Sequence, residues 1–114
     1  MLRNYLEYKK IPIKKSLGQN FLIDSNIINK IIQNINPNEN ETVIEIGPGR
    51  GALTIPLNSI TKNLHAVEID PLLCKYLDSK SLTNLTLHNQ DILNWNFDNL
   101  LNKNNIIIVG NLPY

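Results

Sequence analysis

Residues 41–51 read Glu-Thr-Val-Ile-Glu-Ile-Gly-Pro-Gly-Arg-Gly, and this stretch decides the fold. Its first six residues are rich in β-branched side chains and predict a short strand. Three glycines at alternate positions follow at once. Glycine can adopt positive φ and lets a backbone pass close to a ligand. The stretch therefore predicts a strand that runs into a tight turn, with a short helix over residues 52–60.

The spacing of the glycines indicates which class of cofactor the turn binds. Dinucleotide-binding proteins use Gly-x-Gly-x-x-Gly and hold a pyrophosphate at a helix N-terminus. Here the third glycine, Gly51, comes one residue early, and Glu45 precedes the first glycine by two. This variant suits S-adenosylmethionine, which has no phosphate. A nucleotide-dependent oxidoreductase and a tight turn without a ligand are the alternatives.

Strands and helices alternate along the rest of the chain. Isoleucines at helical spacing predict a helix that ends at Asn36-Pro37. Asp70-Pro71 is typical of a helix start. We predict further strands over residues 64–69, 85–88 and 105–109, and weak helix over 92–104. Such a βαβ series forms a parallel sheet, with helices on both faces.

Polar residues stand where these strands end, and ligands of such sheets bind beyond the carboxyl ends. Glu68 follows the second strand, Asp91 the third and Asn111 the fourth. A carboxylate at Glu68 can accept both hydroxyls of a ribose. Asp91 is placed to accept a hydrogen bond from an adenine amine. The alternative for both is an exposed carboxylate without a ligand.

Residues 111–114, Asn-Leu-Pro-Tyr, predict the chemistry. The lone pair of an exocyclic amine is delocalised into its ring. The Asn111 side-chain oxygen and a neighbouring carbonyl can accept both N–H groups and aim that lone pair at a methyl group. Tyr114 offers a ring on which a flipped base can stack. The alternative is an ordinary turn.

Length and charge suggest two parts. The 114 residues suffice for one domain. Net charge is +1, yet residues 1–15 hold five basic residues against one acidic residue. We predict a basic arm over residues 1–20, which contacts phosphate or is only a solvated terminus. Residues 21–114 form the predicted α/β domain.

Several classes of site and location are excluded or disfavoured. Cys74 is the single cysteine, so the chain has no disulfide and no cysteine-based zinc site. His65 and His88 lack ligand spacing and are interpreted as strand packing. We predict no metal. No apolar run is long enough to span a bilayer or form a signal peptide. We expect a cytoplasmic monomer without a membrane partner.

Five segments together resemble a known family. They are residues 15–24 (KSLGQNFLID), 43–54 (VIEIGPGRGALT), 67–70 (VEID), 90–91 (QD) and 110–114 (GNLPY). They look like the rRNA adenine N6,N6-dimethyltransferases, over about residues 12–114. The most similar branch is the KsgA type, which dimethylates two adjacent adenosines near the 3′ end of 16S rRNA.

The resemblance implies a fold, a cofactor, a partner and a set of contacts. The fold is the Rossmann-like fold of S-adenosylmethionine-dependent methyltransferases, and the partner is 16S rRNA in the small ribosomal subunit or its precursor. Asn20 and Leu22 close over the methionine end of the cofactor. Asn111 and Tyr114 are the catalytic residues. The implied cofactor contacts are Asn20, Leu22, Gly47, Gly49, Glu68, Asp91 and Asn111.

Length is the main departure from this family, whose members continue well past Tyr114. We therefore expect only the N-terminal portion of the methyltransferase fold. The strand over residues 105–109 would then form an exposed apolar edge. One alternative function is an inactive truncated remnant that binds cofactor or rRNA. Another is a large-subunit rRNA adenine methyltransferase of the macrolide-resistance type.

Overall fold

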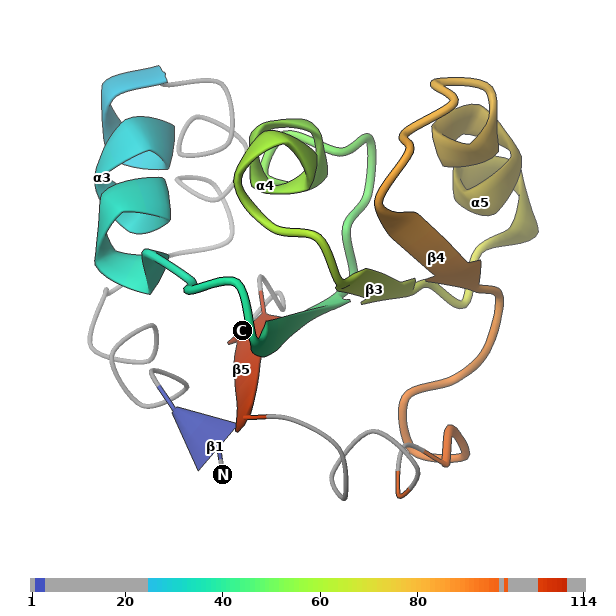
Figure 1. Ribbon diagram of the computed structural model, residues 1–114. Helices are drawn as coiled ribbons and strands as arrows, with labels where there is room; N and C mark the ends of the chain where they lie inside the picture. The colour runs from blue at the N-terminus through green and yellow to red at the C-terminus, as the bar shows by residue number, and fades with distance from the viewer. Residues whose placement is uncertain (1, 4–24, 97, 99–104, 111–114) are drawn as a thin grey trace.

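The computed structural model describes residues 2–3, 25–96, 98 and 105–110. These residues form one parallel sheet, with three helices packed beside it (Figure 1). The strand order is β1-β5-β2-β3-β4. The described elements are β1 (Leu2–Arg3), α3 (Ser25–Ile35), β2 (Glu41–Ile46), α4 (Thr54–Ile60), β3 (Leu64–Val67), α5 (Pro71–Asp78), β4 (Leu85–His88) and β5 (Asn105–Gly110).

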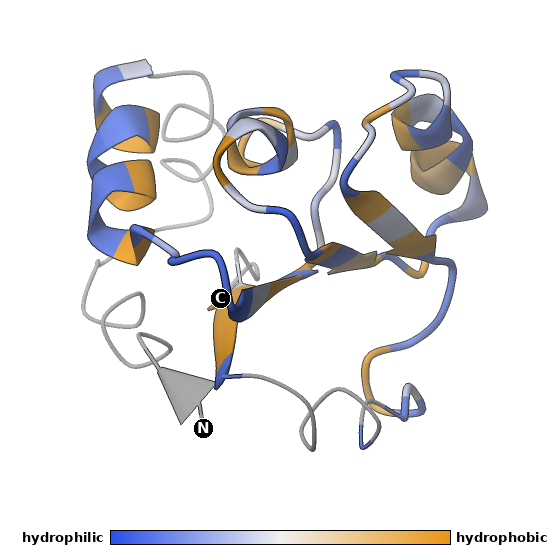
Figure 2. Ribbon diagram, in the orientation of Figure 1, coloured by the Kyte–Doolittle hydropathy of each residue, from blue (hydrophilic) through white to orange (hydrophobic). Residues whose placement is uncertain are grey.

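The predicted strand before the glycines, β2, lies at the centre of the sheet. Its residues 41–45 are all buried. It pairs with β5 from Glu41 beside Asn105 to Ile46 beside Gly110, and with β3 up to Ile46 beside Val67. Burial on both faces explains the continuous apolar run of β5, which is hydrophobic along most of its length (Figure 2).

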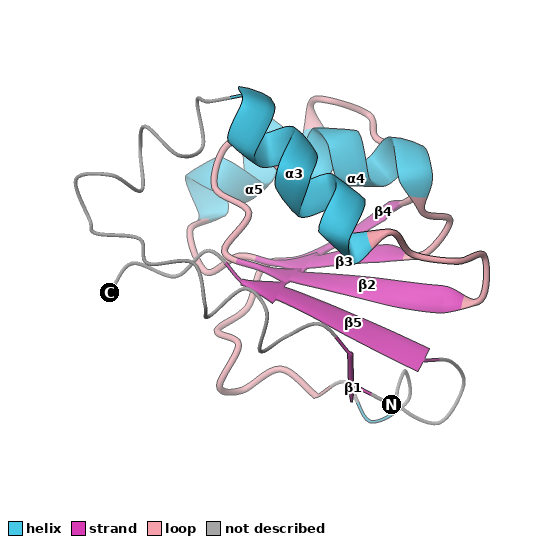
Figure 3. Ribbon diagram, turned by 90° about the vertical axis from the view of Figure 1, so that its left-hand side faces the viewer, coloured by secondary structure: helices cyan, strands magenta, loops and turns pink. Residues whose placement is uncertain are grey.

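All three described helices cover the same face of the sheet (Figures 1 and 3). The predicted isoleucine helix is confirmed as α3, which buries Ile31 and Ile35. It ends where Asn36 adopts a φ of 34° before Pro37. No helix of the described part is long and apolar enough to cross a membrane. The core between the helices and the sheet comprises Ile31, Ile35, Val43, Leu53, Leu57, Leu64, Ile107 and Val109.

The expectation of helices on both faces stays a prediction for the second face, where the described residues include Asp98 in helical conformation. Residues 90–96 run below the sheet in Figure 1 and make turns, not a helix. The Asp91 Oδ1 atom accepts the Leu93 N–H at 3.0 Å at the start of these turns. Trp95, 8% exposed, fills this face against the side chains of Ile44, Val67, Ile106 and Ile108. Most of the predicted helix over 92–104 lies outside the described residues.

The expectation that β5 forms the exposed edge is wrong. β1 pairs in parallel with β5, with Leu2 beside Ile106 and Arg3 beside Ile107. Two residues of the predicted basic arm therefore belong to the sheet. They cover the backbone of β5 where its side chains are fully buried.

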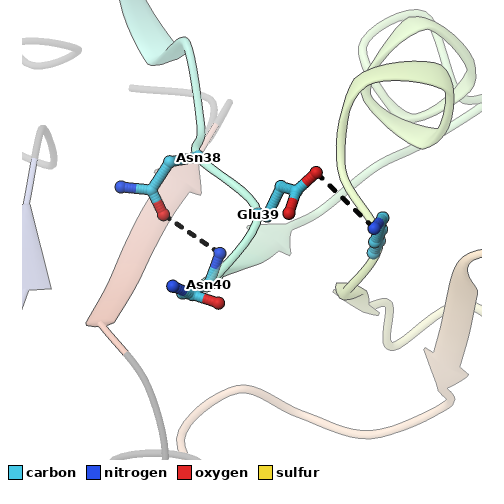
Figure 4. A network of polar contacts seen from close by, with 4 residues as sticks. Asn38, Glu39 and Asn40 are labelled. Atoms are coloured by element: carbon cyan, nitrogen blue, oxygen red, sulfur yellow. Dashed lines mark hydrogen bonds and ion pairs between the residues drawn. The ribbon is translucent and has the colours of Figure 1, made fainter.

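A polar turn lies at the opposite end of the sheet from the glycines. Between α3 and β2, the Asn38 Oδ1 atom accepts the Asn40 N–H at 3.0 Å (Figure 4). The Glu39 carboxylate lies 3.7 Å from the Lys62 ammonium, and both side chains are exposed. An exposed pair of this kind contributes little to stability. Glu39 is therefore a suitable surface control for carboxylate substitutions.

A buried carboxyl group joins β2 to α4. Glu45 is 1% exposed, and the Thr54 hydroxyl donates to its Oε1 atom at 2.5 Å. Burial raises the pKa of Glu45 to about 7, while the Thr54 hydrogen bond lowers it and the charge of Glu68 raises it. Glu45 thus fixes the start of α4 on the strand that precedes the glycine turn.

We expect Glu45→Gln to remove a pH-dependent loss of stability. Between pH 4.5 and about 7 the folded state binds more protons at Glu45 than the unfolded state does. The wild type therefore loses stability as pH rises through this window, and the Gln variant does not. Relative to wild type, the variant should gain on the order of a few kcal/mol in free energy of unfolding between pH 5 and 8.

Urea unfolding at both pH values measures this difference. Glu39→Gln is the control and should follow the wild type at both. If the free energies of unfolding of Glu45→Gln and wild type differ by the same amount at pH 5 and at pH 8, the pKa of Glu45 is not raised in the folded state.

Candidate functional site

The carboxyl ends of β2, β3 and β4 meet around an open pocket of about 120 Å³. The parallel register produces this meeting, because Ile46 lies beside Val67 and Val67 lies beside His88. The residues just past the three strands therefore lie at one edge of the sheet. The pocket is lined by Ile46, Gly47, Val67, Glu68, Ile69, Gln90, Asp91 and Ile92.

The glycine turn leaves β2 with three residues at positive φ. The φ angles are 68° at Gly47, 58° at Gly49 and 90° at Gly51. A Cβ atom at Gly51 would lie 2.8 Å from the Leu77 side chain, so glycine allows α5 to pack closely. A Cβ at Gly49 would meet nothing within 4 Å. Glycine at Gly49 is thus required by its φ, and the space beside it is open to a ligand.

Glu68 connects this turn to the helix that follows β3. Its Oε1 atom accepts the Gly49 N–H at 3.2 Å, and its Oε2 atom accepts the Asp70 N–H at 3.0 Å. The residue is 7% exposed and lines the pocket. A carboxylate has about four acceptor positions, so two bonds leave room for hydroxyl donors of a ligand.

Asp91 lies across the pocket from the glycine turn, after β4. Its Oδ1 atom accepts the Leu93 N–H, and the residue lines the pocket beside Ile92. The walls between the two carboxylates are largely apolar, with Ile46 and Val67 among them. The arrangement can hold a flat apolar group that carries hydroxyls at one end and an amine at the other.

The structure therefore brings together four predicted site residues: Gly47, Gly49, Glu68 and Asp91. Asn20, Leu22, Asn111 and Tyr114 lie outside the described residues. Gly110, which precedes Asn111, is in register with Ile46. The described backbone of β5 thus reaches the edge of the sheet from which the glycine turn departs.

Sequence reasoning missed Asn89 and assigned no role to Glu45. The side chain of Asn89 bonds to the backbone of residues 68 and 69, next to the pocket. Its position two residues before Asp91 was the only available signal, and the chain is rich in asparagine. Glu45 was noted for its spacing to the glycines, but its burial against Thr54 required the structure.

The interpretation of His65 and His88 as strand packing is confirmed. The His65 Nδ1 and His88 Nε2 atoms lie 2.9 Å apart, and the rings stack at 5.2 Å. Burial lowers the pKa of both rings, and at His65 the charge of His88 lowers it too. Cys74 is a free, buried cysteine. The described ranges hold no group of three or more potential metal ligands.

Known proteins are similar to this chain in sequence and in fold. A ribosomal RNA small subunit methyltransferase A from Buchnera aphidicola is 47% identical over 102 residues, which are 88% of this chain and 39% of that protein. The protein of the same name from Coxiella burnetii is 43% identical over 108 residues, 93% of this chain and 42% of that protein. The chain thus spans about two fifths of the length of the curated relatives it matches.

Solved structures agree with the sequence relatives. The crystal structure of the 23S rRNA methyltransferase ErmE superposes with a TM-score of 0.70 at 30% identity, over 80% of this chain and 36% of that chain. A dimethyladenosine transferase from Plasmodium falciparum superposes with a TM-score of 0.67 at 24% identity, over 80% of this chain and 33% of that chain. The fold is therefore the predicted Rossmann-like methyltransferase fold.

The family model for ribosomal RNA adenine dimethylase matches residues 11–114. That range contains every strand of the pocket and the glycine turn. On this match and on the identity to the curated relatives, the chain belongs to the ribosomal RNA adenine dimethylase family.

Proposed function

We propose that this chain is the cofactor-binding part of an S-adenosylmethionine-dependent methyltransferase that dimethylates N6 of two adjacent adenosines near the 3′ end of 16S rRNA. The observation that carries the proposal is that Gly47, Glu68 and Asp91 line one pocket, with the Gly49 N–H donated to the Glu68 carboxylate. In the same proposal the chain acts in the cytoplasm as a monomer.

The charges around the pocket favour this cofactor over a dinucleotide. The charged side chains that line it are Glu68 and Asp91, both acidic. Acidic groups repel the phosphates of a dinucleotide but suit an uncharged nucleoside with hydroxyls and an amine. The residues therefore fit S-adenosylmethionine, which supplies an electrophilic methyl group on a sulfonium. Glu68 would hold its ribose and Asp91 its adenine, while Asn20, Leu22 and Gly47 would enclose its methionine end.

The target amine would be oriented by the residues after β5. Asn111 and a backbone carbonyl would accept its two hydrogens and direct the nitrogen lone pair toward the methyl group. Tyr114 would stack on the base. Both residues follow Gly110, which ends level with Ile46 in the sheet. No strong general base is required for this transfer.

The sequence relatives favour the small-subunit target. The two small subunit methyltransferases are 47% and 43% identical to this chain, whereas the 23S rRNA enzyme ErmE is 30% identical. A remnant that binds cofactor or rRNA without catalysis is the alternative, because the chain spans about two fifths of its curated relatives. Radiolabelled methyl transfer to unmodified small subunits separates the two.

We expect Glu68→Ala to weaken binding of S-adenosylhomocysteine, measured by isothermal titration calorimetry. The variant loses two charge-assisted hydrogen bonds to the ribose, each worth about 1.5–3 kcal/mol, so affinity should fall roughly a hundredfold or more. Glu39→Ala removes an exposed carboxylate at the other end of the sheet and should bind normally. Normal affinity in Glu68→Ala, or no binding by the wild type, would refute the ribose assignment.

We expect Asn111→Ala to slow methylation while cofactor affinity stays within about tenfold, because its bonds act in the transition state. Tyr114→Ala should lower the rate more than Tyr114→Phe, since stacking on a ring is worth about 1–3 kcal/mol and needs no hydroxyl. The rate of single-turnover methylation of small subunits measures the effect of the Asn111 and the Tyr114 substitutions. A Phe variant as slow as the Ala variant would show that the hydroxyl carries the role.

We propose that residues 1–20 form a basic arm that contacts rRNA. Replacing Lys9, Lys10, Lys14 and Lys15 by Gln should weaken binding to a 16S rRNA fragment and flatten its salt dependence. Each phosphate contact contributes a slope of about −0.7 to −0.9 in log affinity against log salt. This variant keeps Arg3 and hence β1 intact.

The matched control replaces four lysines of the body, Lys30, Lys62, Lys75 and Lys80, by Gln. Equal salt slopes in the two variants would mean that the arm makes no specific phosphate contact.

A further inference from the structure

Asn89 connects the ends of two strands that flank the pocket. It follows β4 directly, and its Nδ2 atom donates to the carbonyl oxygens of Glu68 at 3.0 Å and Ile69 at 3.1 Å. These carbonyls belong to the segment that leaves β3. A single amide group thus binds two successive peptide units of the neighbouring strand's exit.

The regular pairing of β3 with β4 ends just before this contact. The last paired residues are Val67 and His88, and the Glu68 N–H donates to the His88 carbonyl at 2.9 Å. Beyond that bond, the described contacts that hold the Glu68 carbonyl are the Asn89 amide and the Cys74 thiol, the latter at 3.4 Å. A thiol is a weak donor, so the amide is the stronger of the two restraints.

Different residues hold the backbone and the side chain of Glu68. The Gly49 and Asp70 N–H groups hold the carboxylate, whereas Asn89 holds the backbone. Gln90 and Asp91, which follow Asn89, line the pocket opposite Glu68 and Ile69. The Asn89 side chain therefore connects the backbone of Glu68 and Ile69 to the segment that carries Gln90 and Asp91.

We propose that Asn89 is a positioning residue of this pocket, whose side-chain amide ties the end of β3 to the end of β4 and so fixes Glu68 relative to Asp91. The inference rests on the proposed function, because the ligand that would use both carboxylates is the nucleoside part of S-adenosylmethionine. Asn89 itself touches no reacting atom in this role.

If the Asn89 amide acts through its hydrogen bonds, its variants should rank in ligand affinity in an order that a purely packing role would not predict. Asn89→Gln keeps both N–H donors on a longer side chain, and Asn89→Ala removes them. Asn89→Asp keeps the shape but sets a carboxylate against two carbonyl oxygens, which is repulsive. Affinity for S-adenosylhomocysteine should fall in the order wild type, Gln, Ala, Asp, with a loss of about tenfold for Ala.

Asn84 provides a matched control at the other end of β4. Its Nδ2 atom donates to the Asn58 carbonyl at 2.9 Å, remote from the pocket. Asn84→Ala and Asn84→Asp should leave the affinity within about twofold of wild type. Thermal unfolding of each variant verifies folding. If Asn89→Asp is unfolded, the comparison of Ala with Gln decides. Equal affinity in Asn89→Ala and Asn84→Ala, or in Asn89→Asp and wild type, would overturn the proposal.

Amide hydrogen exchange tests the same tie without a ligand. The Gly49 and Asp70 amides donate to the Glu68 carboxylate, so Asn89→Ala should speed their exchange severalfold and Asn84→Ala should not. If the wild type binds no S-adenosylhomocysteine, the proposed function fails, and exchange alone decides the role of Asn89. Unchanged exchange at both amides would then refute it.

Discussion

The parallel register around β2 is the constraint on which the rest of the structure depends. Because β5, β2, β3 and β4 run in one direction, Gly110, Ile46, Val67 and His88 end at the same edge of the sheet. Pocket residues separated by more than 40 positions, Gly47 and Asp91 for example, are thereby brought together. The register is secured in turn by burial of β2 on both faces.

The glycine turn and Glu68 act as one unit within this frame. Positive φ at Gly49 directs its N–H toward the Glu68 carboxylate, and the same carboxylate accepts the N–H of the residue that caps α5. The Asp70 Oδ1 atom in turn accepts the Leu72 N–H at 2.9 Å. A helix cap, a carboxylate that lines the pocket and a tight turn are therefore coupled through hydrogen bonds, so a change in one alters the geometry of the others.

Much of the fold could be predicted because its signals are local. The β-branched run before the glycines, the isoleucine spacing of α3 and the Asp70-Pro71 start of α5 each act through short-range preferences. Glu68 and Asp91 could be predicted from strand ends. The pairing of Leu2 with Ile106 could not, because a two-residue strand has no periodicity. The role of Asn89 depends on two backbone carbonyls whose orientation no sequence pattern encodes.

The placement of the single tryptophan gives the molecule an optical probe. The Trp95 ring lies 4.7 Å from the His88 ring and 6.4 Å from the His65 ring, between centroids, on the face of the sheet opposite α3 and α4. Its hydrogen bond to Ile92 at 3.4 Å connects it to a residue that lines the pocket. Intrinsic fluorescence of Trp95 is therefore sensitive to the two histidine rings and, through the bond to Ile92, to a residue of the pocket wall.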